Sequence, residues 1–576
     1  MAKSWKKALS VALSALMLMS SVAFSGIASA APATDETFPV GSTMKFDFGT
    51  IDQKAVDGYI SVEKDDLYEE AKGYGWQSFE GSWGGIYESF AQDEILGDGI
   101  KYNNIRNQVS SSVVEYSYPT FTVDLPNGLY DVRIIQGSKL TEYVSGAYLN
   151  GNMNAVKWST EEWADAYTEP SEASWIESKP NEWRDNTVRV AVYDGKLTVE
   201  LATSLKDDGT SGTGIINAME ITRVEQQAAS EQPRIRFIGD STVATYPPYD
   251  QPDLTPIPEQ TGWGSEFANR QFFADNVIID NKGRGGYSAR NFISKGDFNR
   301  FFVDAKPGDT VMIEWGINET AAGRRYINPN DSALYKEYLM KYVNAVRAFG
   351  GTPVLVTPHT GNANFMKYMR ELAQEENVLL IDMNPQFAAY KKAVPAASSY
   401  LTVDGTHPSR VGGILCAQII TNDLKDLDTP IKPYVKAHPL NTENAPTAVV
   451  SNITVARQTT GSVTLTWEMP ESVIYHPDQM IVRFPVYRKA AGADASTYEK
   501  VGEGTAYVTP DLTAPNLRVT LESPATGDYD YAIAATGLTG TGPMSEPITV
   551  RQYVQSPREA LENLVNEYGY ELRHAP

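Results

Sequence analysis

The chain has 576 residues, of which 42% are apolar and 21% are charged, which is an ordinary composition for a globular protein. Its length is enough for three or four domains at about 150 residues each. A formal net charge of −23 argues against nucleic acid or an anionic membrane surface as a partner. The charge also means that an acidic polymer would not be attracted from a distance, so any recognition of a carboxylate must be local. The single cysteine, Cys416, excludes an intramolecular disulfide, and stability must come from packing or from bound ions.

The first thirty residues have the pattern of an export signal. Three lysines precede an apolar stretch over residues 8–24, and the small residues Ala28-Ser29-Ala30 follow where a signal peptidase cuts. We expect residues 1–30 to be a signal peptide and the protein to be secreted. No later stretch is apolar and long enough to span a bilayer.

Residues 38–224 are rich in aromatic and β-branched side chains. Short alternating runs such as KFDFG (45–49), YDVRIIQG (130–137) and LTVELAT (197–203) are bounded by turn residues, which predicts a β-sandwich. The polar spacer 225–233 ends in proline and is expected to be a linker.

Residues 234–440 change to alternating strand and helix patterns. The apolar runs that suit buried parallel strands are IRFIGD (235–240), NVIIDN (276–281), DTVMIEWG (309–316), TPVLVTP (352–358) and NVLLIDM (377–383). The clearest helical pattern covers residues 332–350 and ends in glycine. This order predicts a flavodoxin-like α/β/α sandwich with a five-stranded parallel sheet, whose ligand lies beyond the carboxyl ends of the strands.

The chain returns to short strands over residues 445–552. SVTLTWEMP, IVRFPVYRKA and DYDYAIAATG resemble a fibronectin type III module, an immunoglobulin-like β-sandwich, which is expected to act as a spacer. In the tail, residues 553–576, Ser556 can cap a short amphipathic helix.

Gly239-Asp240-Ser241 directly follows the first predicted strand of the middle segment. A serine at the carboxyl end of the first strand of such a sheet is well placed for a nucleophile. The alternative interpretation is local, because Asp and Ser are also good caps for a helix or turn.

Asp404-Gly405-Thr406-His407 lies near the end of the same segment. His407 has a nearby carboxylate of the kind that orients a catalytic imidazole. His359, in TPHTG, has no carboxylate in its local sequence, and we expect it to be structural or part of a pocket wall.

Two further groups follow predicted strands. The glycine run 283–286 lets backbone N–H groups approach a ligand closely, and Asn318 offers a side-chain amide after the third strand. Each group alone is equally typical of a turn. Four such groups at strand ends or in the final loop together indicate one active site.

This set resembles the SGNH or GDSL hydrolase superfamily, with the four named residues on Ser241, Gly286, Asn318 and His407. Five segments resemble one branch of this superfamily, the rhamnogalacturonan acetylesterases. They are GDSTVA (239–244), GWGSEF (262–267), GYSARNF (286–292), VMIEWGINE (311–319) and DGTHPSRVG (404–412). The family usually has Asn-Asp in the third block, where this chain has Asn318-Glu319, which puts the fine geometry of that loop in doubt.

The resemblance implies a carboxylic ester hydrolase that removes acetyl groups from pectin, specifically rhamnogalacturonan, in the plant cell wall. Ser241 would attack, His407 would act as base and Asp404 would orient the imidazole; the N–H of Ser241, the N–H of Gly286 and the amide of Asn318 would bind the oxyanion. No metal and no organic cofactor is implied. The candidate substrate contacts are Arg290, Trp263 and Arg284. Surface charge explains Arg284 equally well, whereas Arg290 belongs to the matching SAR run, and core packing explains Trp263 better than a pocket wall.

The N-terminal segment resembles galactose-binding-like jelly-roll modules, through KFDFG, LPNGLYDVRIIQG and INAMEITRV. Its aromatic residues are expected either to stack on sugars or to fill the core. The residues concerned are Tyr74, Trp76, Trp83, Tyr87, Trp158 and Trp163.

Several alternatives stay open. The substrate can be acetylated xylan or another ester, as in other SGNH esterases and lipases, or the chain can be a wall-binding protein without activity. A metal hydrolase using Asp404, His407 and His359 is disfavoured because no His-rich spacing motif is present. The absence of a GxSxG motif disfavours the larger α/β-hydrolase family.

Overall fold

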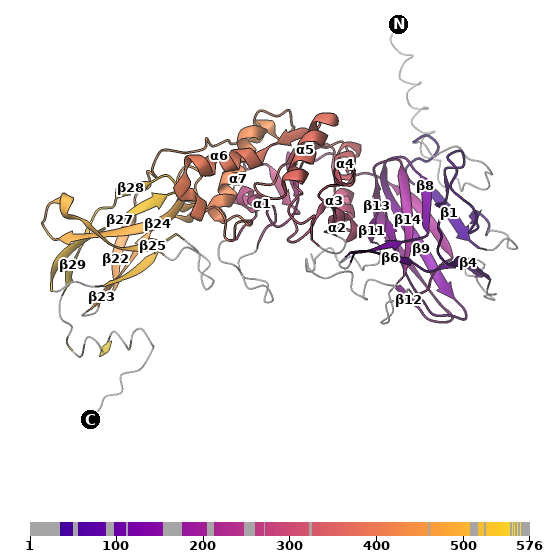
Figure 1. Ribbon diagram of the computed structural model, residues 1–576, viewed down its shortest axis with the longest axis horizontal. Coiled ribbons are helices and arrows are strands. Elements are labelled where there is room, and N and C mark those ends of the chain that lie inside the picture. Colours follow the sequence, from indigo (N-terminus) through magenta and orange to yellow (C-terminus); the bar gives the residue numbers. More distant parts are fainter. Residues whose placement is uncertain are drawn as a thin grey trace, which may run out of the picture. The chain divides into compact units, whose positions relative to one another are not determined.

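The structure is a computed structural model of the chain (Figure 1). It describes residues 35–49, 56–87, 97–110, 113–153, 176–203, 212–246, 260–269, 271–321, 325–458, 461–506, 517–522, 526–552 and, in the tail, 556, 558, 561, 562 and 565. The predicted signal peptide and nearly all of the predicted tail helix lie outside these residues.

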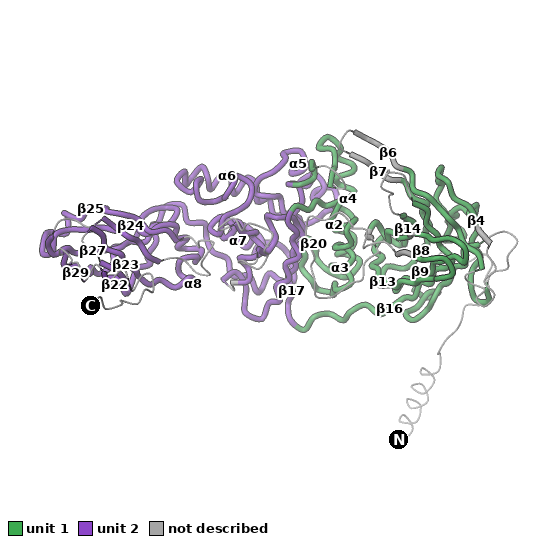
Figure 2. Tube along the Cα trace, turned by 90° about the horizontal axis from the view of Figure 1, so that it is seen from below, with its two compact units in different colours: residues 1–231, 286–311, 318–353 green, residues 232–285, 312–317, 354–576 purple. Residues whose placement is uncertain are grey.

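The chain divides into two compact units (Figure 2). Unit 1 comprises residues 1–231, 286–311 and 318–353, and unit 2 comprises residues 232–285, 312–317 and 354–576. This division groups part of the middle segment with the N-terminal strands and part with the C-terminal strands. The predicted boundaries at 38–224, 234–440 and 445–552 stay predictions.

Two large antiparallel-rich sheets form the N-terminal part of unit 1. The first has the order β13 (Glu182–Val192), β9 (Gly128–Ser138), β16 (Ala218–Val224), β1 (Thr43–Phe48) and β2 (Ile60–Val62). The second has the order β11 (Asn152–Met153), β10 (Tyr143–Leu149), β14 (Lys196–Thr203), β8 (Thr120–Asp124) and β3 (Tyr74–Trp76), with β12 (Ile176–Ser178) paired to β10.

Both sheets contribute to one hydrophobic core, as the alternating sequence pattern requires. Phe46 and Phe48 of β1 contact Phe121 of β8 edge-on, with ring centroids 5.1 and 5.2 Å apart. Smaller sheets complete this part of unit 1: β15 (Gly214–Ile216), β5 (Asp98–Tyr102) and β4 (Trp83–Tyr87), and the pair β6 (Ile105–Ser110) and β7 (Val113–Ser117).

Three helices belong to unit 1: α2 (Ala289–Ser294), α3 (Asp297–Val303) and α4 (Ser332–Ala348). Helices α2 and α3 contact the strands of these sheets, and α4 contacts α2. Asn299 of α3 binds the edge of β13, because its amide donates to the carbonyl of Arg189 and accepts the N–H of Ala191. The ring of Phe298 also packs on Tyr193, with centroids 5.4 Å apart. The helix predicted over 332–350 is present as α4.

The middle segment contains a five-stranded sheet, and all five predicted strands are present. Its order is β18 (Ile278–Asn281), β17 (Arg234–Ile238), β19 (Thr310–Ile313), β20 (Thr352–Val356) and β21 (Leu379–Ile381). The pairs β17–β18 and β20–β21 are parallel. The predicted parallel sheet is confirmed at this level, and its first strand ends directly before Gly239.

The remaining helices of the middle segment lie in unit 2. They are α1 (Trp263–Glu266), α5 (Ala363–Glu375), α6 (Met383–Ala393) and α7 (Arg410–Leu424), with the short 3-10 turns η3 (Phe267–Asn269), η5 (Pro395–Ser399) and η6 (Lys432–Tyr434). Helix α7 is buried along most of its length, and Cys416 within it is fully buried.

The C-terminal strands of unit 2 form two antiparallel sheets. One has the order β22 (Ser451–Gln458), β23 (Ser462–Glu468) and β26 (Arg518–Glu522); the other has β25 (Glu499–Thr505), β24 (Ile481–Ala490), β27 (Gly527–Gly537) and β28 (Thr541–Met544), with β29 (Ile548–Gln552) paired to β27. The helix α8 (Glu471–Ile474) and the turn η7 (Ala495–Thr497) complete them. One hydrophobic core runs from the middle segment through α7 to these sheets.

The chain thus combines several β-sheets with a parallel α/β sheet, as predicted. Within the part of the chain that the structure describes, no helix is long and apolar enough to cross a membrane.

Candidate active site

The turn that carries Ser241 follows β17 immediately. Gly239 has no room for a side chain, because a Cβ there would lie 2.4 Å from Val243 and 2.9 Å from the carbonyl of Glu314. Asp240 caps the turn: its Oδ1 accepts the N–H of Thr242 at 2.9 Å, and its carbonyl accepts the N–H of Ala244 at 3.0 Å. The capping interpretation therefore holds for Asp240, while the hydroxyl of Ser241 stays available for another partner.

The loop that carries His407 is held by its own carboxylate. Asp404 Oδ1 accepts the backbone N–H groups of Thr406 and His407 at 2.9 and 2.8 Å. Gly405 has a φ of 89°, a left-handed conformation that favours glycine. The N–H of Val403 donates to the carbonyl of His407 at 2.9 Å and closes the loop.

The structure brings Ser241, His407 and Asp404 together in unit 2. His407 Nε2 lies 3.0 Å from Ser241 Oγ, and His407 Nδ1 lies 2.7 Å from Asp404 Oδ2. Because a carboxylate only accepts, Nδ1 carries the proton and Nε2 is left to accept the proton of the serine hydroxyl. Burial raises the pKa of Asp404, but the hydrogen bonds from His407 and Thr406 outweigh this and lower it to about 2.

A group of buried carboxyls lies behind the serine turn. Asp240 and Glu314 are both fully buried, and the hydroxyl of Thr242 bonds to both of them. The indole N–H of Trp263 donates to the second oxygen of Glu314 at 2.9 Å. Burial raises the pKa of Glu314, and the neighbouring Asp240 carboxylate raises it further.

His359 lies close to the catalytic loop but is buried. Its ring is 4% exposed and packs on Phe387, with centroids 4.9 Å apart. Burial lowers its pKa to about 4, so the ring is neutral at neutral pH. This placement fits the structural role that we expected.

The other two predicted oxyanion donors, Gly286 and Asn318, lie in unit 1. Gly286 has a φ of 73°. The side-chain amide of Asn318 donates to the carbonyl of Tyr287, the residue that follows Gly286, at 2.9 Å. Arg325 donates to the carbonyl of Gly286 at 3.2 Å. These contacts fix the two residues relative to each other, and their oxyanion role stays a prediction.

Glu319, the residue that departs from the family pattern, is fully buried. Its Oε1 accepts the N–H of Ala289, the first residue of α2, at 3.0 Å. Its carbonyl accepts the N–H of Ile327 at 2.6 Å. The longer glutamate therefore fastens the loop after β19 to the start of α2.

The three candidate substrate contacts lie in different surroundings. Trp263 has no exposed surface and packs on Phe237, so it supports the serine turn from the core. Arg290 is half-buried and donates to the carbonyl of Tyr326 at 3.1 Å. Arg284 is half-buried, and its backbone N–H donates to the carbonyl of Gly239 at 2.8 Å, which ties it to the serine turn.

The aromatic residues of the N-terminal sheets are mainly core where they are described. Trp76 is 1% exposed and contacts Phe48, Trp83 and Phe121. Trp158 and Trp163 lie outside the described residues, as does the side chain of Tyr87. Trp183, which is not among the aromatic residues named from the sequence, is 44% exposed and is therefore not part of the core.

Sequence reasoning missed Glu314 and Thr242. The signal for Glu314 was a single charged residue inside the apolar run VMIEWG, because a carboxyl in a buried strand needs specific partners. Thr242 gave no signal, since a threonine after a strand is common.

Comparisons with known proteins agree with these features. Residues 44–160 match the family model described as "Beta-agarase/YXIM esterase-like, galactose-binding domain-like". "Uncharacterized esterase YxiM" of Bacillus subtilis is 28% identical over 73% of this chain and 98% of its own length. "Rhamnogalacturonan acetylesterase RhgT" of the same organism is 26% identical over 35% of this chain and 94% of its own length.

A crystal structure of the Bacillus subtilis protein YxiM is 27% identical and covers 67% of this chain and 98% of that one, with a TM-score of 0.30. The relatives confirm the expected resemblance to rhamnogalacturonan acetylesterases with a galactose-binding-like N-terminal region. They also confirm the expected class, a carboxylic ester hydrolase.

Proposed function

We propose that this chain is a secreted carbohydrate esterase that hydrolyses acetyl esters on rhamnogalacturonan, a pectic polysaccharide of the plant cell wall, through an acetyl-enzyme on Ser241. The observation that carries the proposal is the pair of contacts made by His407, 3.0 Å from Ser241 Oγ and 2.7 Å from Asp404 Oδ2. A serine hydroxyl is a weak nucleophile until a base within hydrogen-bond reach removes its proton.

In the first half of the reaction Ser241 Oγ attacks the acetyl carbonyl carbon while its proton passes to His407 Nε2. The imidazolium that forms is stabilised by Asp404, whose lowered pKa keeps it charged over the working range. The oxyanion accepts hydrogen bonds from the N–H of Ser241, the N–H of Gly286 and the amide of Asn318. His407 then protonates the sugar oxygen, which leaves as an alcohol.

In the second half water attacks the acetyl group on Ser241. His407 takes one proton from this water and returns it to Ser241 Oγ as acetic acid leaves. The acid then ionises to acetate and releases the second proton of the water to solvent.

The polysaccharide substrate is supported by the names of two relatives, both rhamnogalacturonan acetylesterases. The net charge of −23 gives no long-range attraction for an acidic polymer, so local arginines must recognise any galacturonate carboxylate. Arg284 is the best placed of the candidates, because its backbone is bonded to the residue that opens the serine turn. Arg290 is the second candidate.

The finer architecture belongs to the same proposal. We infer a three-layer α/β/α segment over 234–440, a jelly roll over 38–224 and an immunoglobulin-like module over 445–552. The shared core of the two N-terminal sheets supports the jelly roll, and the sheet order β18-β17-β19-β20-β21 supports the flavodoxin-like segment.

The test is release of acetate from acetylated rhamnogalacturonan and acetylated xylan by the secreted protein, compared with Ser241→Ala. The proposal expects faster release from rhamnogalacturonan and loss of release from both in the variant. Preference for xylan would refute the pectin assignment alone, whereas full activity of Ser241→Ala would refute the mechanism. Detection of the protein only inside the producing cell would refute secretion.

A further inference from the structure

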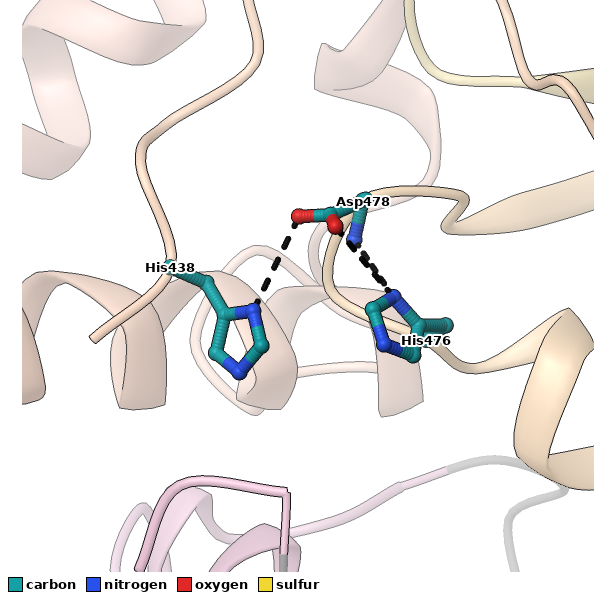
Figure 3. A group of neighbouring side chains, drawn as sticks. All are labelled: His438, His476 and Asp478. Atoms are coloured by element: carbon teal, nitrogen blue, oxygen red, sulfur yellow. Dashed lines mark hydrogen bonds and ion pairs between the residues drawn. The ribbon is translucent and has the colours of Figure 1, made fainter. Parts of the chain in front are cut away.

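Three side chains of metal-binding types, two imidazoles and one carboxylate, meet in unit 2 (Figure 3). His438, His476 and Asp478 each offer a ligand atom, and the three atoms lie within 4.8 Å of one another. His438 lies in the segment that follows η6, while His476 and Asp478 lie in the loop after α8. The chain thus brings two imidazoles and a carboxylate together from positions 38 to 40 residues apart (476 − 438 and 478 − 438).

The ring of His438 is held in one orientation. Its Nε2 lies 3.0 Å from the carbonyl of Gln271, and since a carbonyl only accepts, Nε2 carries a proton. The edge-on contact with Phe272, at 5.6 Å between centroids, supports the same orientation. In the neutral ring Nδ1 therefore has a free electron pair, which faces Asp478 Oδ1 at 3.8 Å.

His476 presents a similar arrangement from the other side. Its Nδ1 lies 3.7 Å from Asp478 Oδ2 and accepts the backbone N–H of Asp478 at 3.2 Å, so this nitrogen carries its electron pair toward Asp478 and a metal bond would replace that hydrogen bond. The two rings are nearly perpendicular, at 89°, with centroids 5.5 Å apart. A nitrogen electron pair that faces a carboxylate is favourable only with a proton or a cation between them, and a metal ion can serve both rings at once.

We propose that His438, His476 and Asp478 bind a divalent transition-metal ion, with zinc as the best match. Imidazole nitrogen with one carboxylate suits zinc, whereas calcium and magnesium prefer oxygen ligands. Bond lengths of about 2.0–2.2 Å place neighbouring ligands of a tetrahedral zinc about 3.3–3.5 Å apart. The separations of 3.7 and 3.8 Å therefore close with small side-chain rotations, and water supplies the fourth ligand.

The hydrogen bond from His438 Nε2 to Gln271 has the form found around zinc ligands. Ligating histidines usually donate their second N–H to a carbonyl or carboxylate, which fixes the tautomer and the ring plane. The side chains of His438, His476 and Asp478 are 20%, 37% and 54% exposed, so an ion can reach them from solvent.

Such an ion would join the segment after η6 to the loop after α8, and helix α7 already holds both. The amide of Asn422 donates to the carbonyl of His438 at 3.0 Å, and the amide of Gln418 donates to the carbonyl of Pro477 at 3.3 Å. The metal would act as a cross-link in a chain that has no disulfide. This inference is independent of the proposed esterase activity, and it departs from the expectation that the chain needs no metal.

Zinc binding to the mature protein, produced without a polyhistidine tag and stripped with EDTA, tests the proposal. Isothermal titration with zinc is expected to give one site per chain. His438→Ala, His476→Ala and Asp478→Asn should each weaken binding by about tenfold or more. At one zinc concentration, zinc should also raise the Tm of the wild type more than the Tm of these variants.

Matched controls separate this site from adventitious binding. Asp528→Asn changes an exposed carboxylate in β27, outside the cluster, and His407→Ala removes the catalytic imidazole. Both variants should keep the stoichiometry and affinity. Circular dichroism identifies any variant that fails to fold, and acetate release does so for every variant except His407→Ala. If His476→Ala fails to fold, His476→Gln replaces it. Absence of saturable zinc binding, or binding that all three ligand substitutions leave intact, would overturn the proposal.

Discussion

The indole N–H of Trp263 donates to Glu314 Oε2 at 2.9 Å, and the other oxygen of the same carboxyl group bonds to the hydroxyl of Thr242. Thr242 also bonds to Asp240 Oδ1 at 2.9 Å. One hydroxyl proton cannot serve two carboxylates, so one of the two acids must be protonated. The raised pKa of Glu314 makes it the proton holder, and the turn that carries Ser241 rests on a neutral buried carboxyl.

This arrangement predicts how stability depends on pH. The pKa of Glu314 is higher in the folded than in the unfolded protein, so its protonated carboxyl stabilises the fold. This stabilisation is fully present below the pKa of the unfolded state and is lost as pH rises through the pKa of the folded state. In Glu314→Gln the side chain has the same shape as the protonated glutamate and cannot ionise. From pH 5 to 8 we expect the free energy of unfolding of this variant to fall less than that of the wild type. The difference between the two slopes is up to about 1.4 kcal/mol per pH unit. Urea denaturation at several pH values measures this.

Glu499→Gln serves as the control, since Glu499 is exposed and should leave the profile unchanged. Parallel pH profiles for the wild type and Glu314→Gln would show that Glu314 is ionised in the folded protein.

Asp404→Asn should lower kcat by about 10³–10⁴-fold with little change in KM. Asparagine can still accept the two backbone N–H groups, but it neither fixes the tautomer of His407 nor stabilises its charged form. Steady-state kinetics on an acetyl ester measures the effect. A loss of less than tenfold would mean that another group orients His407.

Asn318→Ala should lower kcat by about 10²–10³-fold and leave KM nearly unchanged, because an oxyanion donor acts mainly in the transition state. The exposed Asn330 provides the control, and Asn330→Ala should retain full activity. A rise in KM at constant kcat would instead assign Asn318 to ordinary substrate binding.

Gly412→Ala should destabilise the fold. A Cβ at this position in the first turn of α7 would lie 1.9 Å from the carbonyl oxygen of Leu401, which belongs to the strand-like stretch that carries the catalytic loop. Overpacking of this kind typically costs about 1–3 kcal/mol or more, which thermal unfolding detects as a lower Tm. Gly461→Ala, where nothing lies within 4 Å of the added Cβ, should change the Tm little.

The sequence predicted much of this arrangement because its signals are local. The five apolar runs became β17 to β21, and the loop that carries Asp404 and His407 places the imidazole between the Asp404 carboxylate and Ser241. The support behind the serine turn was not predicted, since Glu314 and Trp263 meet only through the tertiary fold. The sequence around Trp263 allows a substrate contact as well as core packing, because a sequence pattern does not say which face of a short helix is buried. The cluster of His438, His476 and Asp478 likewise depends on how two loops approach α7.

The most direct test of the central claim is to trap the covalent intermediate on Ser241. The protein is mixed with an excess of an activated acetyl ester, quenched in acid within the first turnover, digested and analysed by peptide mass spectrometry. The mass of one acetyl group on the peptide that contains Ser241, absent from Ser241→Ala and accumulating in a burst before steady state, is the predicted result. Acetate release at the wild-type rate by Ser241→Ala, or acetyl transfer to a different residue, would contradict the account.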